Sequence, residues 1–540
     1  MKPKLSNILV CGTIMKRFVV LVIILDVICC SSIFAKEGEF SDSQIAQMRL
    51  QRKQAAHNKR RIIYNNDGCD WLDNRVKPPL TVEKFLKRRT TALINSQVDS
   101  IFYCTGVFNA YTHKSTVSEQ MGYNGLAEEQ RVFAKLLNEA GYDTLQAIVD
   151  FGHKHNKEVI WSMRMNDTHD SSKDRPWMWT KWKKDNLHLL MAEKYTSFPY
   201  GWDPRPSWPW SAVDYEKQQV RDKVLEILTD VCSRYDIDGV ELDFFRFPVF
   251  FKPQLYGQPV TQQHCDMMTD LVKKVRVMTE NVSLKRGRPL LVAVRVPDSF
   301  GYAKEMGLDV VNWLDNDLVD IIIGGGTIQL QTWDKLVAAV KKYDVPVYAC
   351  FEDSMVPYSG LSVQEQCEYW RAAALEAWRA GVDGVYTFNM FNPNHPMLDE
   401  IGDPNLLEKL PRKEQFSPSW FIYRHAAKVG IQLKGGEKYF DPNYAKRWLE
   451  PVPQIMNPVG FGFEPNAIVL VKDPYKLSLS KSNGAYRLVD IVKDPDEMHD
   501  LKKKKAGIYQ TMKNELEDWI YKHSQYYELP RQYLKYVSKK

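Results

Sequence analysis

Two acidic residues lie two positions apart in the segment YDIDGVELDFFRFP, residues 235–248. In an extended strand, Glu241 and Asp243 point to one face, and Val240, Leu242 and Phe244 point to the other. Two carboxylates on an inner face cost free energy unless water, a partner or a substrate compensates them. Carboxylate pairs that flank a bond, with one acid kept protonated by its surroundings, perform glycoside hydrolysis. The segment therefore predicts acid/base chemistry.

The two acids are expected to play different parts. Asp243 lies nearer the end of the strand, where we expect it to be catalytic; the structural alternative is a salt bridge to Arg246 or Arg295. Glu241 lies deeper along the strand, so we expect it to orient its neighbour or to pair with Arg164 or Arg295.

A third carboxylate, Glu352, ends a later strand-like run and is expected to face Asp243 across the fold. Such a pair can act as acid/base and nucleophile when close together, or as an inverting pair when farther apart. The structural alternative for Glu352 is a carboxylate that caps the next helix or binds a loop. Asp298, at the end of another run, is the alternate partner.

The elements that must position these residues repeat along the chain. Strand-like runs alternate with helical stretches whose apolar residues recur at three- and four-residue steps. There are eight such runs: residues 61–71, 100–109, 158–169, 239–248, 290–298, 320–326, 345–353 and 384–392. Eight β/α units in series predict a (β/α)8 TIM barrel of class α/β. A doubly wound sheet is the competitor, but no GxGxxG turn follows the first run.

A TIM barrel places its active site at the carboxyl ends of the strands, where polar residues cluster in this sequence. Tryptophan can stack on sugar rings, and arginine can clamp carboxylate or sulfate groups. Together these residue types favour a polymeric carbohydrate, with an anionic one consistent with the arginines. The predicted substrate-binding residues are Asp67, Trp71, Asn109, Arg164, Asn166, His169, Trp177, Trp179, Arg246, Arg295, Asp298 and Asn389.

Composition divides the chain and limits its partners. Residues 1–35 have a basic start at Lys16 and Arg17, an apolar stretch and small residues before Ala35, which is typical of a signal peptide. We expect a secreted or periplasmic protein, with cell-surface attachment or an uncleaved anchor as the alternative, and no stable membrane partner beyond export. The formal net charge of +6 over 540 residues predicts no nucleic-acid partner.

The rest of the chain is expected to form three parts: an N-terminal extension (36–60), the catalytic barrel (61–430) and a small C-terminal α+β accessory domain (431–540). After the leader, six cysteines remain, widely spaced and without a CxxC pair, which predicts no zinc knuckle. A metal-dependent barrel would need His and Asp ligands that converge at the strand ends. Only Asp167 and His169 resemble such a set. We expect no metal and no cofactor.

The segment 235–248 resembles the fourth strand of family-10-like glycosyl hydrolases, which are secreted barrel proteins. Gly239, Asp243, Arg246 and Pro248 match that pattern, and Glu241 stands where a His is common. The resemblance implies a glycoside-hydrolase-like barrel over about residues 60–400. Residues 485–519 are similar to the closing segment of sulfatases, although the chain has no Cys/Ser-x-Pro-x-Arg nucleophile motif.

The sequence therefore predicts an exported glycoside hydrolase that cleaves a polysaccharide with carboxylate acid/base chemistry. The alternative is a noncatalytic carbohydrate-binding protein that keeps the barrel.

Overall fold

The computed structural model of the chain describes most of the barrel and the core of a second unit. The described residues are 40–68, 70, 81–121, 123, 133–172, 175, 178–196, 208–326, 329–352, 361–413, 459–464, 467–472, 474–480, 483–490, 493–494, 499–524 and 533–537. The chain divides into two compact units, of which the second consists chiefly of residues 445–540. The predicted signal peptide and the predicted boundary at residue 431 lie outside the described residues.

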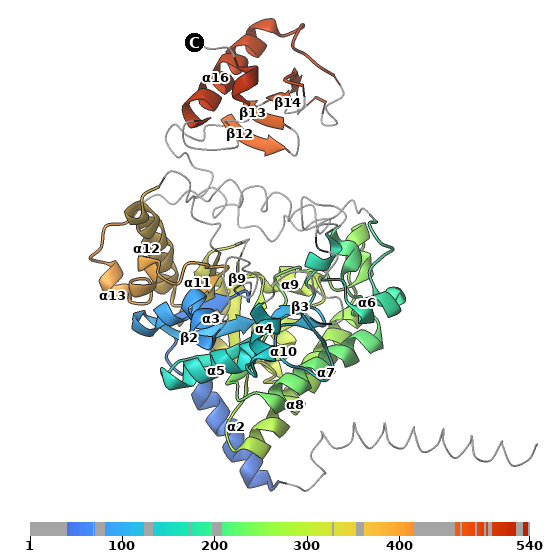
Figure 1. Cartoon of the computed structure of the whole chain (residues 1–540), viewed down its shortest axis with the longest axis vertical. Helices are drawn as coiled ribbons and strands as arrows, with labels where there is room; N and C mark the ends of the chain where they lie inside the picture. Colours follow the sequence, from blue (N-terminus) through green and yellow to red (C-terminus); the bar gives the residue numbers. More distant parts are fainter. Residues whose placement is uncertain are drawn as a thin grey trace, which may run out of the picture. The chain divides into compact units, whose positions relative to one another are not determined.

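Eight parallel strands close into a barrel in the first unit, as the sequence predicts (Figure 1). The strands are β1 (Ile62–Asn66), β2 (Val98–Cys104), β6 (Glu158–Arg164), β7 (Gly239–Asp243), β8 (Leu291–Val296), β9 (Ile321–Gly325), β10 (Val347–Glu352) and β11 (Gly384–Phe388). They run around the barrel in the order β1-β11-β10-β9-β8-β7-β6-β2. The fold is therefore a (β/α)8 barrel.

Helices alternate with the strands and surround them (Figure 1). They are α3 (Val82–Arg89), α4 (Phe133–Glu139), α5 (Thr144–Lys154), α6 (Lys181–Asp185), α7 (Gln218–Arg234), α8 (Gln262–Arg286), α9 (Phe300–Glu305), α10 (Val310–Asp315), α11 (Trp333–Val340), α12 (Val363–Ala380) and α13 (Pro404–Leu407). In α7 the buried residues Val220, Val224, Ile227 and Val231 recur at three- and four-residue steps, which places one apolar stripe against the sheet. Gly287 ends α8 in the left-handed conformation, with φ 72°.

The inside of the barrel is filled by alternate residues of the strands. Its apolar part comprises Ile63, Phe102, Ile160, Leu291, Ala293, Ile321, Ile323, Tyr348, Cys350, Tyr386 and Phe388, with Ala56 packed among them. Glu241 pairs in register with Ala293, so the acidic face of β7 points inward. The ring of Phe244 lies 5.4 Å from the ring of Trp313 in α10, outside the barrel. The prediction of two opposite faces on this strand is confirmed.

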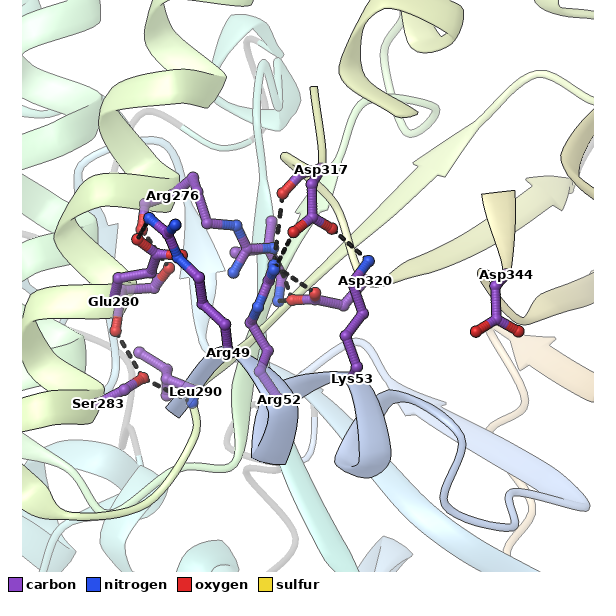
Figure 2. A network of polar contacts seen from close by, with 12 residues as sticks. Arg49, Arg52, Lys53, Arg276, Glu280, Ser283, Leu290, Asp317, Asp320 and Asp344 are labelled. Carbon is purple, nitrogen blue, oxygen red and sulfur yellow. Dashed lines mark hydrogen bonds and ion pairs between the residues drawn. The ribbon is translucent and has the colours of Figure 1, made fainter. Parts of the chain in front are cut away.

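A helix that precedes the barrel, α2 (Asp42–Ala56), packs at the amino end of the strands. Arg52 is 2% exposed and binds Asp320, which precedes β9, through Nη1–Oδ1 (2.9 Å). Arg276 of α8 donates to the other oxygen of Asp320 (2.7 Å). Arg52 and Lys53 also bind Asp317 (Figure 2). These ion pairs attach α2 to two neighbouring β/α units.

The long segment after β6 has a polar core of its own. Lys183 and Asp170 are fully buried, and Lys183 Nζ donates to Asp170 Oδ2 (2.6 Å) and to the carbonyl of Ser211 (2.9 Å). Ser211 Oγ donates to the other oxygen of Asp170 (2.7 Å). Every polar atom of this pair has a partner, so the described part of the segment, residues 165–172 and 208–217 with those around α6, forms a packed structure.

Two smaller sheets complete the described structure. One lies after β2 and contains β3 (Gly106–Val107), β4 (Ala110–Tyr111) and β5 (Glu119–Gln120). The second unit contains the antiparallel sheet β12 (Val459–Glu464), β13 (Ala467–Lys472), β14 (Tyr475–Ser480) and β15 (Tyr486–Asp490), with the helix α16 (Ala506–Ser524). Leu470, Leu488 and Leu516 form part of its core. Within the described residues, no helix combines the length and apolarity needed to cross a membrane.

Candidate active site

A row of three charged residues crosses the carboxyl end of the barrel. Arg164 on β6 pairs in register with Asp243 on β7, which pairs with Arg295 on β8. Arg295 donates to both oxygens of Asp243, through Nε–Oδ1 (2.9 Å) and Nη2–Oδ2 (3.1 Å). The backbone N–H of Phe245 donates to the same carboxylate (3.0 Å). The side chain of Asp243 is 0% exposed, so the salt bridge with Arg295 that the sequence offered as an alternative is formed.

Glu241 lies one layer deeper in the barrel. Its Oε2 accepts a hydrogen bond from the hydroxyl of Tyr386 on β11 (3.1 Å). The prediction named Arg164 or Arg295 as its partner, whereas the hydrogen bond that the structure shows comes from a tyrosine. Burial and the charge of Asp243 raise the pKa of Glu241 to about 8, so this acid is protonated at neutral pH.

Three guanidinium groups converge on the ring of Phe388, the last residue of β11. The distances from Cζ to the ring centroid are 3.9 Å for Arg295, 5.9 Å for Arg164 and 6.0 Å for Arg246. A cation over an aromatic face is attracted by the ring quadrupole. Phe388 therefore organises the cationic side of the site, although its own sequence context carried no signal for this.

Glu352 comes to the same end of the barrel. It ends β10 and pairs in register with Phe388. Its Oε1 accepts a hydrogen bond from Asn389 Nδ2 (3.3 Å), and Asn389 adopts a φ of 56° directly after β11. Glu352 is 6% exposed, and its charge acts on Arg246. Asp243 and Glu352 thus share the carboxyl end, where each is reached by the arginine cluster.

An aspartate orients a histidine beside these arginines. Asp167 Oδ1 accepts from His169 Nδ1 (2.7 Å), and Asp167 Oδ2 accepts from Arg164 Nη1 (3.2 Å). Arg246 Nη2 lies 3.4 Å from His169 Nε2. Because a guanidinium only donates, Nε2 must accept, which requires a neutral histidine with its proton on Nδ1. Burial lowers the pKa of His169, which agrees with the neutral form.

Of four predicted binding residues, Asn166, Asp298 and Asp67 have their polar groups engaged by the fold. Asn166 donates to the carbonyl of Val213 (2.9 Å) and accepts from its N–H (2.8 Å). Asp298 accepts from the N–H groups of Leu330 and Gln331 in the next loop. Asn109 occupies the turn between β3 and β4 with φ 62°, and its Oδ1 is buried without a hydrogen-bond partner.

The fourth of these residues, Asp67, forms an ion pair with Arg89 beyond the end of β1. The predicted contact of these four residues with substrate stays a prediction.

The described tryptophans pack against the protein. Trp179 is 8% exposed, and its ring lies 4.9 Å from that of Trp210. Trp182 lies 5.6 Å from Phe108. These rings form the apolar part of the segment after β6. Trp71 and Trp177 lie outside the described residues.

Sequence reasoning singled out neither Tyr386 nor Asp70, a fully buried acid that accepts from Asn66 (3.0 Å) and Tyr103 (3.2 Å). Asp70 stands in the first strand-like run, so the polar sequence NNDGCD was the signal that could have identified it. Among the residues that the structure describes, no group of three His, Cys, Asp or Glu side chains could hold a metal ion.

A closed barrel with ionisable side chains at the carboxyl ends of its strands is the architecture of TIM-barrel enzymes. Residues 71–276 of this barrel match the model of the family Glycosyl hydrolase-like 10, which confirms the resemblance seen in the strand with Glu241 and Asp243. No curated protein matches the sequence. The similarity of residues 485–519 to sulfatases has no support from these comparisons.

Solved structures with a similar fold include three glycoside hydrolases. The PgaB (BpsB) glycoside hydrolase domain from Bordetella bronchiseptica has 10% identity and a TM-score of 0.39, over 64% of this chain and 98% of its own. A family 18 N-acetylglucosaminidase from Paenibacillus barengoltzii has 12% identity and a TM-score of 0.35, over 65% and 100%. Alpha-L-fucosidase isoenzyme 2 from Paenibacillus thiaminolyticus has 13% identity and a TM-score of 0.36, over 69% of this chain. The chain covers 49% of that fucosidase.

The match relates residues 71–276 of the chain to glycoside-hydrolase-like proteins.

Proposed function

We propose that the protein is an exported glycoside hydrolase that cleaves a polysaccharide by carboxylate acid/base chemistry. The observation that carries the proposal is the position of Glu352. It ends a barrel strand at the catalytic end, is held by the amide of Asn389, and lies within electrostatic reach of Arg246. A positioned carboxylate at this end of the fold is suited to proton transfer at a glycosidic oxygen.

In this proposal the two acids of β7 act through other groups. Asp243 is closed off from solvent by its bidentate pair with Arg295, so it positions that guanidinium against Phe388. Glu241 stays neutral below it and accepts from Tyr386, which keeps a second negative charge out of the barrel interior. Glu352 is the catalytic carboxylate, and Asp243 and Glu241 are positioning residues.

The experiment compares hydrolysis by the wild-type chain and three variants on neutral, uronic and sulfated polysaccharides, measured as the release of reducing ends. Glu352→Gln should lower the turnover number by about 10²- to 10⁴-fold, the usual contribution of a general acid or base. Glu408→Gln, a control at an acid whose side chain is 47% exposed, should leave it unchanged. Asp243→Asn should reduce activity together with stability. Full activity in Glu352→Gln would refute the assignment of Glu352.

One observation favours a noncatalytic carbohydrate-binding protein instead. The buried ion pair with Arg295 removes Asp243 from direct contact with a substrate. A binding protein would retain polysaccharides in affinity electrophoresis and release no reducing ends, with wild type and Glu352→Gln behaving alike. Release of reducing ends by the wild type, and not by Glu352→Gln, would exclude this alternative.

The proposal of export is supported by the sequence of residues 15–35 alone. N-terminal sequencing of the protein from the culture medium or periplasm should find a mature chain that begins after Ala35. Recovery of the full-length chain from the cytoplasm alone would contradict it.

A further inference from the structure

Arg246 is a cation at the carboxyl end of the barrel, and no carboxylate among the described residues pairs with it. It follows β7, and its guanidinium carbon lies 4.7 Å from the ring centroid of Phe247 and 6.0 Å from that of Phe388. Its polar contact is Nη2 with His169 Nε2, at 3.4 Å. Nε is buried and makes no hydrogen bond. In the part of the chain that the structure describes, no carboxylate forms an ion pair with Arg246.

The two neighbouring arginines differ from Arg246 in this respect. Arg164 is paired with Asp167, and Arg295 is paired with both oxygens of Asp243. The nearby acids Asp167 and Glu352 act on Arg246 through space, without contact. Burial and the positive charge of Arg164 disfavour the charged form of Arg246, so the pKa of its guanidinium is lowered. The described part of the fold therefore holds a partly desolvated charge with which none of its acids forms an ion pair.

The surrounding residues fix the direction of this unmatched group. Its guanidinium carbon lies over the rings of Phe247 and Phe388, and His169, oriented by Asp167, accepts from Nη2. The planar fork of arginine matches two oxygens on one carbon or sulfur atom. A buried charge that lacks a partner is destabilising. Proteins keep such destabilising groups chiefly at functional sites, where a ligand can supply the partner.

We infer that Arg246, with Arg164 beside it, binds an anionic oxo group of the saccharide: the carboxylate of a uronic acid or a sulfate ester. The inference rests on the proposed function in taking a saccharide as the ligand. It adds that the preferred substrate is charged, and that the preference resides in one side chain.

The test is a comparison of affinities for glycans that differ only in charge. One pair is pectate and its methyl ester; the other is chondroitin sulfate and its chemically desulfated form. Affinity electrophoresis in the cold gives dissociation constants for the wild type, Arg246→Gln, Arg246→Lys and the control Arg379→Gln. Arg379 is an exposed arginine paired with Glu408, in the last turn of α12, which leads into the amino end of β11.

The wild type should bind the charged member of one pair about 10- to 100-fold more tightly than the neutral member, as expected for hydrogen bonds to a charged group. The pair that shows the preference distinguishes carboxylate from sulfate. Arg246→Gln should abolish the preference, and Arg379→Gln should keep it. Arg246→Lys should keep part of it, because the charge remains and the fork is lost. The preference should weaken as salt is added.

Equal binding of charged and neutral glycans by the wild type would overturn the inference. So would a preference that persists in Arg246→Gln. Circular dichroism checks that each variant is folded, and should Arg246→Gln fail that check, Arg246→Lys with a reduced preference carries the test.

The two proposals fail in different ways. A wild type that prefers the charged glycan and cleaves neither member overturns the hydrolase proposal alone. A wild type that cleaves glycans without regard to charge overturns the anion site alone. Retention of no glycan overturns both.

Discussion

Arg295 holds Asp243 by both carboxylate oxygens, at 2.9 and 3.1 Å, and neither side chain reaches solvent. The two residues are register partners on neighbouring strands, so the pair is built into the barrel. Gly326 leaves room for it, because a Cβ at that position would lie 2.6 Å from Arg295 Nη1.

Removing one partner of this pair should destabilise the barrel strongly. Asp243→Asn leaves the Arg295 guanidinium buried without its counter-ion, so we expect the free energy of unfolding to fall by about 3–5 kcal/mol. Urea denaturation followed by circular dichroism measures it. The control Glu408→Gln, at a surface pair, should change it by less than about 1 kcal/mol. The double variant Asp243→Leu/Arg295→Met should lose less than either single substitution; simple additivity would show that the two charges are not coupled.

Stability should depend on pH through Glu241. Its pKa is raised from 4.5 in the reference state to about 8 in the fold, so the folded protein binds the proton more tightly. The stabilisation by this proton is complete below about pH 4.5 and is lost as the pH rises towards about 8, with a slope of up to about 1.4 kcal/mol per pH unit.

Glu241→Gln cannot titrate, so its stability relative to wild type should rise between about pH 5 and about pH 8. Urea denaturation of both proteins across this range measures the difference, with Glu408→Gln as the control. A difference that stays constant with pH would mean that Glu241 is ionised in the fold.

The segment after β6 should loosen when its buried lysine is removed. Lys183→Met leaves Asp170 buried without its cation, whereas Lys181→Met removes a lysine that is 77% exposed and paired along the helix with Asp185. Hydrogen exchange should become faster around α6 and residues 208–215 in the Lys183 variant and stay unchanged in the Lys181 variant. Equal protection in both variants would contradict a stabilising role of the Lys183–Asp170 ion pair in this segment.

Helix α2 offers a similar comparison. Arg52 is buried against Asp320, and the side chain of Arg49 is 56% exposed and bound to Glu280 (Figure 2). Arg52→Met should lower the free energy of unfolding by about 2–4 kcal/mol, and Arg49→Met by at most about 1 kcal/mol. Thermal or urea denaturation checks this; equal effects would show that α2 does not contribute through its buried pair.

The barrel was predictable because each strand is an apolar run that ends in polar residues. These runs alternate with helical stretches whose apolar residues recur at three- and four-residue steps. The inward direction of Glu241 and Asp243 follows from the same alternation. The pairing of Asp243 with Arg295 could be named only as one of two alternatives, because the choice depends on which strands are neighbours.

Other features needed long-range information. Tyr386 meets Glu241 from the eighth strand, across the closed barrel. An indole that packs against a neighbouring ring looks the same in sequence as one that binds a ligand, and Trp179 is of the first kind. Helix α2 has no apolar stripe, and its buried residues are Arg52 and Ala56, so periodicity gives no signal for it.

The location of α2 has a practical use. Its contacts lie at the amino ends of the strands, whereas Glu352 is the last residue of β10 and Arg246 follows the carboxyl end of β7. A tether joined just before Ser41 would therefore attach the barrel through the amino ends of its strands, and a chip or bead carrying the protein in this way would leave the end with Glu352 and Arg246 turned away from the support.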